Sequence, residues 1–190
     1  MDASSDVTDA GGDSTALDAG ADSGAPDADA AGDGAVGDCV ARPVNLLPNG
    51  DFSSGLSEWS VSDTSTEFST GPCGQALHVQ TTGAYGGLSY QGKRTFPVGT
   101  KLRLRGWFKS PTAPTGVTPA VFASLYHPGD AGDVSDSEVW TAVTLETGWK
   151  LSEATLVTKH EETSFTFVVA SRRTTGGDDF FVSGLALYVE

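Results

Sequence analysis

From Val44 onward, short apolar runs alternate with polar residues, and clusters of Gly, Pro, Ser, Thr and Asp separate the runs. This period-two alternation is typical of strands that bury one face, and the closely spaced turn signals are typical of an all-β protein. No segment has the length and period of a helix that could connect parallel strands. The pattern therefore predicts an all-β fold, an antiparallel two-sheet β-sandwich. The expected strands are Asn45–Phe52, Glu58–Ser62, Gln75–Thr81, Gly87–Gln91, Lys101–Lys109, Ala120–His127, Thr141–Glu146, Leu151–Thr158, Ser164–Ser171 and Phe180–Val189.

The first 38 residues have a different composition, with ten Asp, ten Ala and seven Gly but no Lys, Arg or aromatic residue. Such a segment cannot build an apolar core and stays solvated. We therefore divide the chain into a disordered acidic linker, residues 1–38, and a folded domain, residues 39–190. The formal net charge is −14, and the domain itself has 15 acidic against 11 basic side chains. This charge argues against nucleic acid as a partner, because phosphate binding needs a clustered basic surface.

The chain contains no apolar run of the roughly 20 residues that span a bilayer. The best candidate, residues 180–189, is interrupted by Ser183 and Gly184, so we expect no transmembrane segment. The chain also begins at Met1 without a signal peptide, so either the protein is cytosolic or its export signal lies upstream. We prefer the second, because the Asp/Ala/Gly/Ser tail resembles the spacers that follow the acylated cysteine of bacterial surface lipoproteins. That resemblance implies an extracellular or cell-surface location and a lipid anchor upstream of the given chain.

The two cysteines, Cys39 and Cys73, belong to no Cys-x-x-Cys pair and no Cys/His cluster. Zinc binding by these cysteines is therefore not expected. They can form one intramolecular disulfide or remain two buried thiols. An exported protein favours the disulfide, which would join the start of the domain to a loop one or two strands later.

The segment from Asn45 to Trp59 reads NLLPNGDFSSGLSEW. It resembles the opening of carbohydrate-binding modules of families 4, 9 and 22, which is roughly N-L-L-x-N-G-x-F-E-x-G-x-x-x-W. Further similar segments follow in the same order, so that the resemblance covers residues 44–190: Gln75–Val79, Gly87–Gln91, Leu102–Lys109, Gly148–Leu151 and Asp179–Leu187. The resemblance implies a galactose-binding-like jelly roll that holds polysaccharide, without catalysis, against a concave sheet or at loop tips.

Members of these families usually carry Glu after the Phe of the opening motif and Asp in the last strand, where the carboxylates help to hold a structural calcium ion. This chain has Ser53 and Ser183 at the matching positions. Calcium needs several oxygen ligands, so we expect no cofactor. The alternative is a structural calcium ion for which Asp51 or Asp179 supplies a carboxylate.

Alternation also assigns side chains to the two faces of each strand. The side chains expected to point into the core are Leu77, Val79, Leu102, Leu104, Phe108, Val121, Ala123 and Leu125. Those expected to point outward are His78, Gln80, Arg103, Arg105, Trp107, Phe122, Ser124 and Tyr126. If these strands belong to one concave sheet, the outward side chains form one sugar-binding surface, because aromatic rings stack on the apolar face of a pyranose and polar groups bind its hydroxyls.

The candidate ligand-binding residues are Trp107, Tyr126, Arg103, Arg105, Gln91, His78, Tyr90 and Trp140. We interpret Trp107 and Tyr126 as stacking platforms, and the alternative is that a loop covers them. Trp140 follows Asp130–Glu138, an expected loop, and either contacts a glycan at the rim or anchors that loop. The resemblance places Trp59 and Trp149 in the core.

Catalysis has little support in the sequence. His78, His127 and His160 lie in separate segments without the spacing of metal ligands, so no metal site is expected. Asp178 and Asp179 are adjacent on a strand and point to opposite faces, which does not suit acid and base catalysis on one glycosidic bond. We predict a non-catalytic polysaccharide-binding module and not an enzyme. The alternatives are a structural or protein-interaction jelly roll of the cell envelope and an accessory domain of a larger enzyme.

Overall fold

The computed structural model describes residues 39, 44–113, 119–129, 132–172 and 177–190, which contain ten strands and no helix. The first sheet has the order β1-β4-β9-β6-β7, with β1 Ser60–Ser62, β4 Gly87–Phe96, β9 Glu162–Ala170, β6 Ala120–Gly129 and β7 Gly132–Ala142. The second sheet has the order β2-β3-β10-β5-β8, with β2 Thr64–Gly71, β3 Gly74–Thr81, β10 Asp179–Val189, β5 Lys101–Lys109 and β8 Lys150–Val157.

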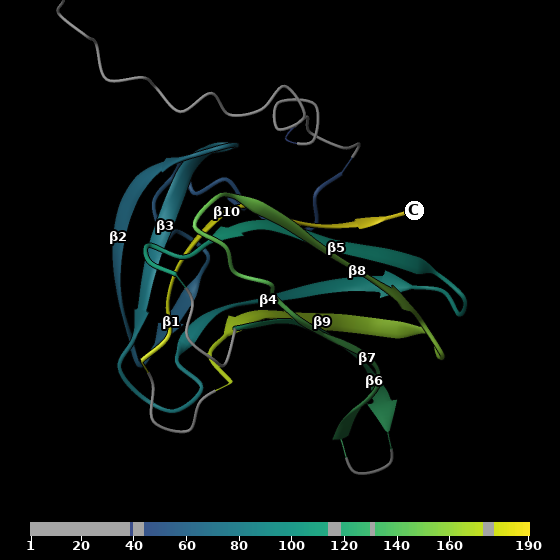
Figure 1. Ribbon diagram of the computed structural model, residues 1–190. Coiled ribbons are helices and arrows are strands. Elements are labelled where there is room, and N and C mark those ends of the chain that lie inside the picture. The colour runs from purple at the N-terminus through teal and green to yellow at the C-terminus, as the bar shows by residue number, and fades with distance from the viewer. Residues whose placement is uncertain (1–38, 40–43, 114–118, 130–131, 173–176) are drawn as a thin grey trace, which may run out of the picture. The chain divides into compact units, whose positions relative to one another are not determined.

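The two sheets lie face to face as layers, with β5 and β8 of the second sheet over β4 and β9 of the first (Figure 1). Every strand pairing in the described residues is antiparallel. This architecture confirms the predicted all-β jelly-roll sandwich. Among the described residues, no helix has the length and apolarity that a membrane crossing requires.

The core fills the space between the layers with side chains that alternate along each strand. Leu102, Leu104 and Phe108 of β5 are at most 1% exposed. The same period buries Val121, Ala123 and Leu125 of β6 and Leu77 and Val79 of β3, so the inward assignments made from alternation are confirmed. Trp59 is buried too, as predicted, and its ring lies 6.1 Å from the ring of Phe167 on β9.

The opening motif does not form the predicted strand Asn45–Phe52, because its residues adopt successive turns. The Asn45 side chain instead bonds to β10: its amide donates to the Leu185 carbonyl at 3.0 Å, and its oxygen accepts from the Leu187 N–H at 3.0 Å. The Gly50 carbonyl accepts from the Leu185 N–H at 2.8 Å. A Cβ at Gly50 would lie 2.0 Å from the Leu185 oxygen, so only glycine permits this close approach. The motif therefore anchors the chain to the last strand.

The predicted disulfide between Cys39 and Cys73 is confirmed, with 5.2 Å between the two Cα atoms. Cys73 lies in the turn between β2 and β3. The bridge packs against a bulge in β10, where Gly184 has φ of +59° and a Cβ would lie 2.6 Å from the Cys73 sulfur. The bridge therefore fixes residue 39 to the second sheet.

Two further predictions, one of a loop and one of a strand, are wrong, and one strand was not predicted. The acidic stretch expected as a loop, Asp130–Glu138, lies mostly in β7, and the segment Thr141–Glu146 contributes only its first two residues to that strand. Strand β2, with the sequence TSTEFSTG, was not expected at all. Both missed strands lie at sheet edges, where one side of the ladder has no partner strand and polar residues occur on both faces.

Candidate functional site

The eight candidate ligand-binding residues do not share one surface. His78, Arg103, Arg105 and Trp107 belong to β3 and β5 of the second sheet, whereas Gln91, Tyr90, Tyr126 and Trp140 belong to β4, β6 and β7 of the first. The outer faces of the two sheets point in opposite directions because the core lies between them. The single concave surface expected from alternation is therefore wrong, although alternation gave the correct face of β3, β5 and β6.

Strand register arranges the outer face of the first sheet in three rows that cross β4, β9, β6 and β7. The first row is Ser89, Val168, Phe122 and Trp140. The second row is Gln91, Thr166, Ser124 and Glu138. The third row is Lys93, Ser164 and Tyr126. A polar row thus lies between a row that ends in two aromatic rings and a row that contains Tyr126; we call this surface the front face.

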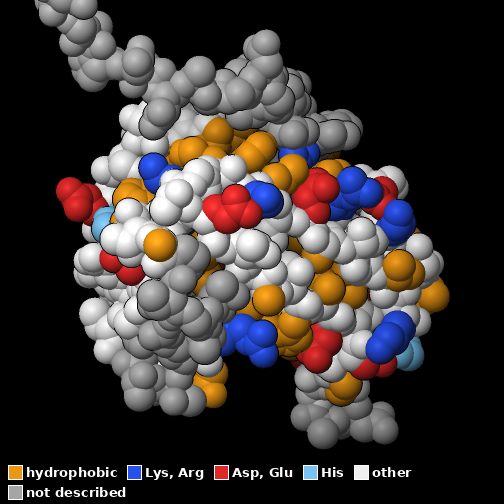
Figure 2. Space-filling view, in the orientation of Figure 1, with side chains coloured by type: hydrophobic (Ala, Val, Ile, Leu, Met, Phe, Trp, Pro, Cys, Tyr) orange, Lys and Arg blue, Asp and Glu red, His pale blue; other side chains and the backbone are white. Residues whose placement is uncertain are grey.

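The front face is hollowed. A cavity of about 540 Å³ lies over the second and third rows, and its lining residues are Gln91, Gly92, Lys93, Tyr126, Asp133, Ser164, Phe165 and Thr166. A second cavity of about 340 Å³ adjoins the first at Gly92, Lys93 and Phe165 and extends toward Tyr90 and Leu46. In Figure 2 the molecule is hollowed at its lower margin, on the side where the β6–β7 hairpin of Figure 1 descends. The lining offers hydroxyl, amide, ammonium and carboxylate groups to a ligand.

Trp140 is the most exposed aromatic side chain of the front face, with 59% of its surface accessible. It lies within β7, not in a rim loop, and directly opposite Phe122 of β6. The two rings stack with their centroids 4.0 Å apart and 28° between their planes. Phe122 therefore supports one side of the indole and leaves the rest of its surface accessible.

Tyr90 points toward the interior, unlike its neighbour Gln91. Its ring lies 6.0 Å from Trp59 and 5.8 Å from Phe165, and it is half-buried beside the core. The Tyr90 side chain reaches solvent through the second cavity, whereas Gln91 is exposed on the front face.

The polar candidates on the second sheet are engaged with other side chains. Arg103 and Lys101 pair with Glu190, and the hydrogen bond from Lys101, with the Arg103 charge, lowers the pKa of the Glu190 carboxyl. Arg105 is only 4% exposed, and its Nε lies 3.6 Å from Glu153. The predicted outward position of Arg105 on β5 is correct, but its guanidinium is covered.

The aromatic candidates on the second sheet are also partly covered. Trp107 is half-buried beside the β10 bulge, and its Nε1 is buried without a hydrogen-bond partner among the described residues. His78 stacks on Phe181 with centroids 4.2 Å apart, and its Nε2 lies 2.5 Å from Asp179. Trp149 is half-buried, with its ring 6.4 Å from Phe181, and lies outside the core cluster, so its predicted place in the core is wrong.

The residues considered for calcium have other partners. Ser183 is fully buried, and its hydroxyl donates to the Gln75 carbonyl at 2.9 Å. Asp51 accepts from both the N–H and the hydroxyl of Ser53, at 3.1 and 2.9 Å. Asp179 is paired with His78. The absence of a cofactor and the alternative of structural calcium both stay predictions.

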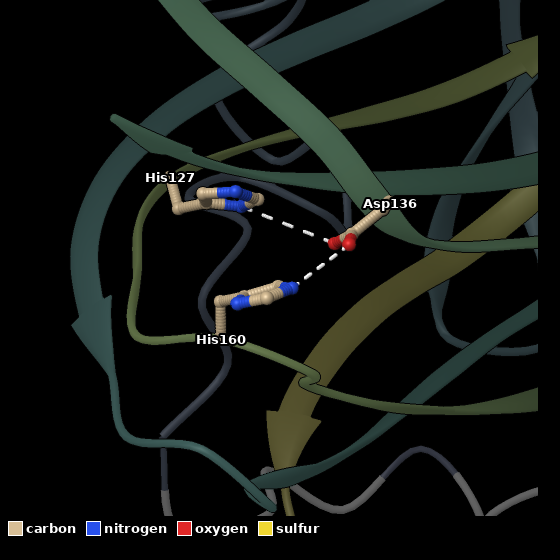
Figure 3. A group of neighbouring side chains, drawn as sticks. All are labelled: His127, Asp136 and His160. Carbon is tan, nitrogen blue, oxygen red and sulfur yellow. Dashed lines mark hydrogen bonds and ion pairs between the residues drawn. The ribbon is translucent and has the colours of Figure 1, made fainter. Parts of the chain in front are cut away.

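Sequence reasoning missed that two of the histidines meet. His127 and His160 lie with their ring centroids 4.3 Å apart, and the Asp136 carboxylate lies beside both rings and faces a nitrogen atom of each (Figure 3). The residues come from the end of β6, from β7 and from the β8–β9 connection. Their spacing along the chain carries no signal, because strand pairing and a loop that returns to the same edge bring them together.

The family described as "Carbohydrate binding domain" matches residues 44–176, which include β1 to β9 and exceed half of the chain. The chain therefore belongs to this family of carbohydrate-binding domains, and its function is carbohydrate binding. The resemblance inferred from the opening motif is confirmed. No curated protein matches the chain.

Solved structures share the fold. A family 16 carbohydrate binding module is 20% identical, with a TM-score of 0.56, and the alignment covers 76% of this chain and 99% of the module. The bacteriophage CBA120 tailspike protein 4 is 12% identical, with a TM-score of 0.59 and coverage of 77% of this chain and 22% of the tailspike chain. The Clostridium thermocellum xylanase 10B, solved with xylohexaose, is 11% identical, with a TM-score of 0.51 and coverage of 71% and 26%. The chain thus spans about a quarter of the length of these two longer proteins.

Proposed function

We propose that the domain is a non-catalytic module that binds a polysaccharide chain across the front face, with Trp140 as the stacking platform and Gln91, Tyr126 and Lys93 as polar contacts. The observation that carries this proposal is the row arrangement: a polar row lies between a row that ends in Phe122 and Trp140 and a row that contains Tyr126, with a cavity over the second and third rows. Adjacent strands are about 4.8 Å apart, so the four crossed strands offer an extended track of about 14 Å. An internal stretch of a glycan fits such a track better than a single terminal sugar.

The chemistry of the front face suits a sugar chain. The exposed indole face of Trp140 can take the C–H face of a pyranose, and amide, hydroxyl and ammonium groups can bind its hydroxyls. Few groups engage each sugar, so we expect dissociation constants in the micromolar to millimolar range, roughly −8 to −4 kcal/mol.

The outer face of the second sheet is the less favourable site. Its arginines and His78 are paired with acidic side chains, and binding a sugar there would break these pairs. We also propose an extracellular or cell-surface location, with residues 1–38 as a solvated acidic linker, because an open glycan-binding face is useful where polysaccharides are accessible. No catalytic role is proposed for the domain.

The test is retention of the full chain on immobilised xylan, cellulose, β-glucan, galactan and arabinan, together with a glycan array. Xylan is included because the xylanase that shares the fold was solved with xylohexaose. Trp140→Ala and Tyr126→Ala change the front face, and the matched controls Trp107→Ala and Trp149→Ala remove aromatic rings from the second sheet. We expect binding that the first pair loses and the controls retain.

Two other outcomes would contradict this assignment. Loss of binding only in Trp107→Ala or Trp149→Ala would move the site to the second sheet. Absence of binding across the panel, by a protein with the circular dichroism of a folded β-sandwich, would overturn polysaccharide binding and favour a structural or protein-interaction role.

A further inference from the structure

Three metal-ligating side chains converge at one end of the first sheet. His127 lies near the end of β6, Asp136 lies on β7, and His160 lies in the connection between β8 and β9. One ligand atom from each lies within 4.8 Å of the others, and both imidazole rings face the Asp136 carboxylate (Figure 3). No other such group of three occurs in the described part of the chain.

The distances leave this group incompletely bonded. His160 Nε2 lies 2.9 Å from Asp136 Oδ2, which is a hydrogen bond. His127 Nδ1 lies 3.9 Å from Asp136 Oδ1 and 3.5 Å from Glu162 Oε2, and both distances exceed the usual hydrogen-bond range. His127 Nδ1 therefore has no hydrogen-bond partner among the described residues.

The buried carboxylate of Glu162 is an independent sign of a ligand. Glu162 is 0% exposed; its Oε1 accepts a hydrogen bond from Ser137 at 2.6 Å, while its Oε2 faces His127. Three polar atoms here are buried without a hydrogen-bond partner among the described residues: His127 Nδ1, Asp136 Oδ1 and Glu162 Oε2. Leaving such atoms unpaired is costly, and a cation placed among them would satisfy all three.

We propose that His127, Asp136 and His160, with Glu162 beside them, bind one divalent transition-metal ion of the zinc class. Two imidazoles and carboxylate oxygens in a tetrahedral arrangement form a ligand set that suits Zn²⁺, whereas Ca²⁺ and Mg²⁺ prefer oxygen ligands alone. The two carboxylates balance the charge of the ion. The Lys159 ammonium donates its hydrogen bond to the backbone carbonyl of Asp136 and not to the carboxylate oxygens of Asp136 or Glu162.

The geometry needs only a small adjustment to accept an ion. A zinc ion binds its ligand atoms at about 2.0–2.2 Å. Ligand atoms bound in this way lie closer to one another than the 4.8 Å that limits the distances between the ligand atoms of His127, Asp136 and His160. His160 is half exposed and lies in a connecting segment, so its side chain can move inward. Ser137 holds Glu162 from behind, since its hydroxyl donates to the carboxylate and accepts from the Lys159 N–H at 2.9 Å.

The test is isothermal titration of the full chain with ZnCl₂ after dialysis against EDTA, with CoCl₂ as a second probe because the absorption of bound Co²⁺ reports the coordination geometry. We expect one Zn²⁺ per chain and a tetrahedral Co²⁺ spectrum. His160→Ala and Asp136→Asn should each raise the dissociation constant for Zn²⁺ about tenfold or more. The matched control is His78→Ala, which removes the third histidine of the chain, on the second sheet, and should leave zinc binding unchanged.

Melting curves in EDTA verify that each variant is folded, and both substituted side chains are exposed enough to be replaced without loss of packing. No stoichiometric Zn²⁺ binding by the parent chain would overturn the proposal. Equal Zn²⁺ binding by the parent, His160→Ala and Asp136→Asn would also overturn the proposal. Binding of that kind would come from other groups, such as the acidic residues of 1–38, which every variant retains. The result is independent of polysaccharide binding, which is measured with other variants.

Discussion

Phe122 and Trp140 lie directly opposite each other on β6 and β7, and their rings stack with centroids 4.0 Å apart. Trp140 belongs to β7, and within the part of the chain that the structure describes no strand pairs with the other side of β7. Phe122 is therefore the residue that holds the indole in a fixed orientation on the front face. An indole held in this way loses less conformational entropy when a ligand stacks on it.

Phe122→Leu should weaken polysaccharide binding without abolishing it, because leucine keeps an apolar side chain but removes the stacked ring. The expected loss is about 0.5–1.5 kcal/mol, a roughly two- to tenfold higher dissociation constant, and Trp140→Ala should lose more. Affinity electrophoresis in gels that contain the bound polysaccharide measures both. Unchanged affinity of Phe122→Leu would show that Trp140 needs no support.

Reduction of the Cys39–Cys73 bridge should lower the melting temperature. The bridge joins residues 34 positions apart, and the chain-entropy model gives a contribution of about 3–4 kcal/mol for a loop of this size. For a domain of this length, that contribution corresponds to a decrease of roughly 6–15 °C, measured by differential scanning calorimetry with and without reductant. The double variant Cys39→Ser/Cys73→Ser should melt like the reduced protein and should not respond to reductant.

Ser137→Ala should destabilise the domain by about 1–3 kcal/mol, because it leaves the buried Glu162 oxygen and the Lys159 N–H without their partner. Urea denaturation measures this change. Ser62→Ala is the control, since Ser62 is an exposed strand residue and its removal should change stability by less than about 0.5 kcal/mol. Equal stability of the two variants would mean that water replaces the Ser137 hydroxyl.

The ion pairs of Glu190 should make a small, acid-sensitive contribution to stability. Lys101 and Arg103 lower the pKa of the Glu190 carboxyl from its usual value of 4.5, so the folded state favours the carboxylate. This contribution is present above pH 4.5 and is lost as the pH falls through the lower pKa of the folded state. Denaturation curves of the parent and Glu190→Gln should therefore differ at pH 6 and converge as the pH falls below the lowered pKa of the folded state. A difference that persists at low pH would contradict the pairing.

The alternation of apolar and polar side chains predicted those strands whose two faces differ in polarity. The bounds of β5 were predicted correctly, because Leu102, Leu104 and Phe108 alternate with Arg103, Arg105 and Trp107. Strand β7 escaped prediction because acidic and serine residues occupy both of its faces before Val139 and Trp140. A strand of that composition is held by pairing with β6, which is a tertiary effect and leaves no period in the sequence.

The candidate site depended on which strands share a sheet, and alternation carries no such information. Trp107 and Tyr126 were each predicted on the outer side of their strand, and both are there, but on opposite layers. The meeting of His127 and His160 has the same cause, since the end of β6 and the connection between β8 and β9 lie side by side at one end of the first sheet. Only the order of strands in space, set by the whole chain, decides these neighbours.

The position of the disulfide has a mechanical consequence. A pulling force applied through residue 39 passes across the Cys39–Cys73 bond into the β2–β3 turn and bypasses residues 40–72. The strands on either side of this turn, β2 and β3, both belong to the second sheet, so the force enters the domain through that sheet before the backbone carries it on to β1 and β4 of the first. A load carried by the linker would thus enter the domain on the sheet that lies opposite the front face.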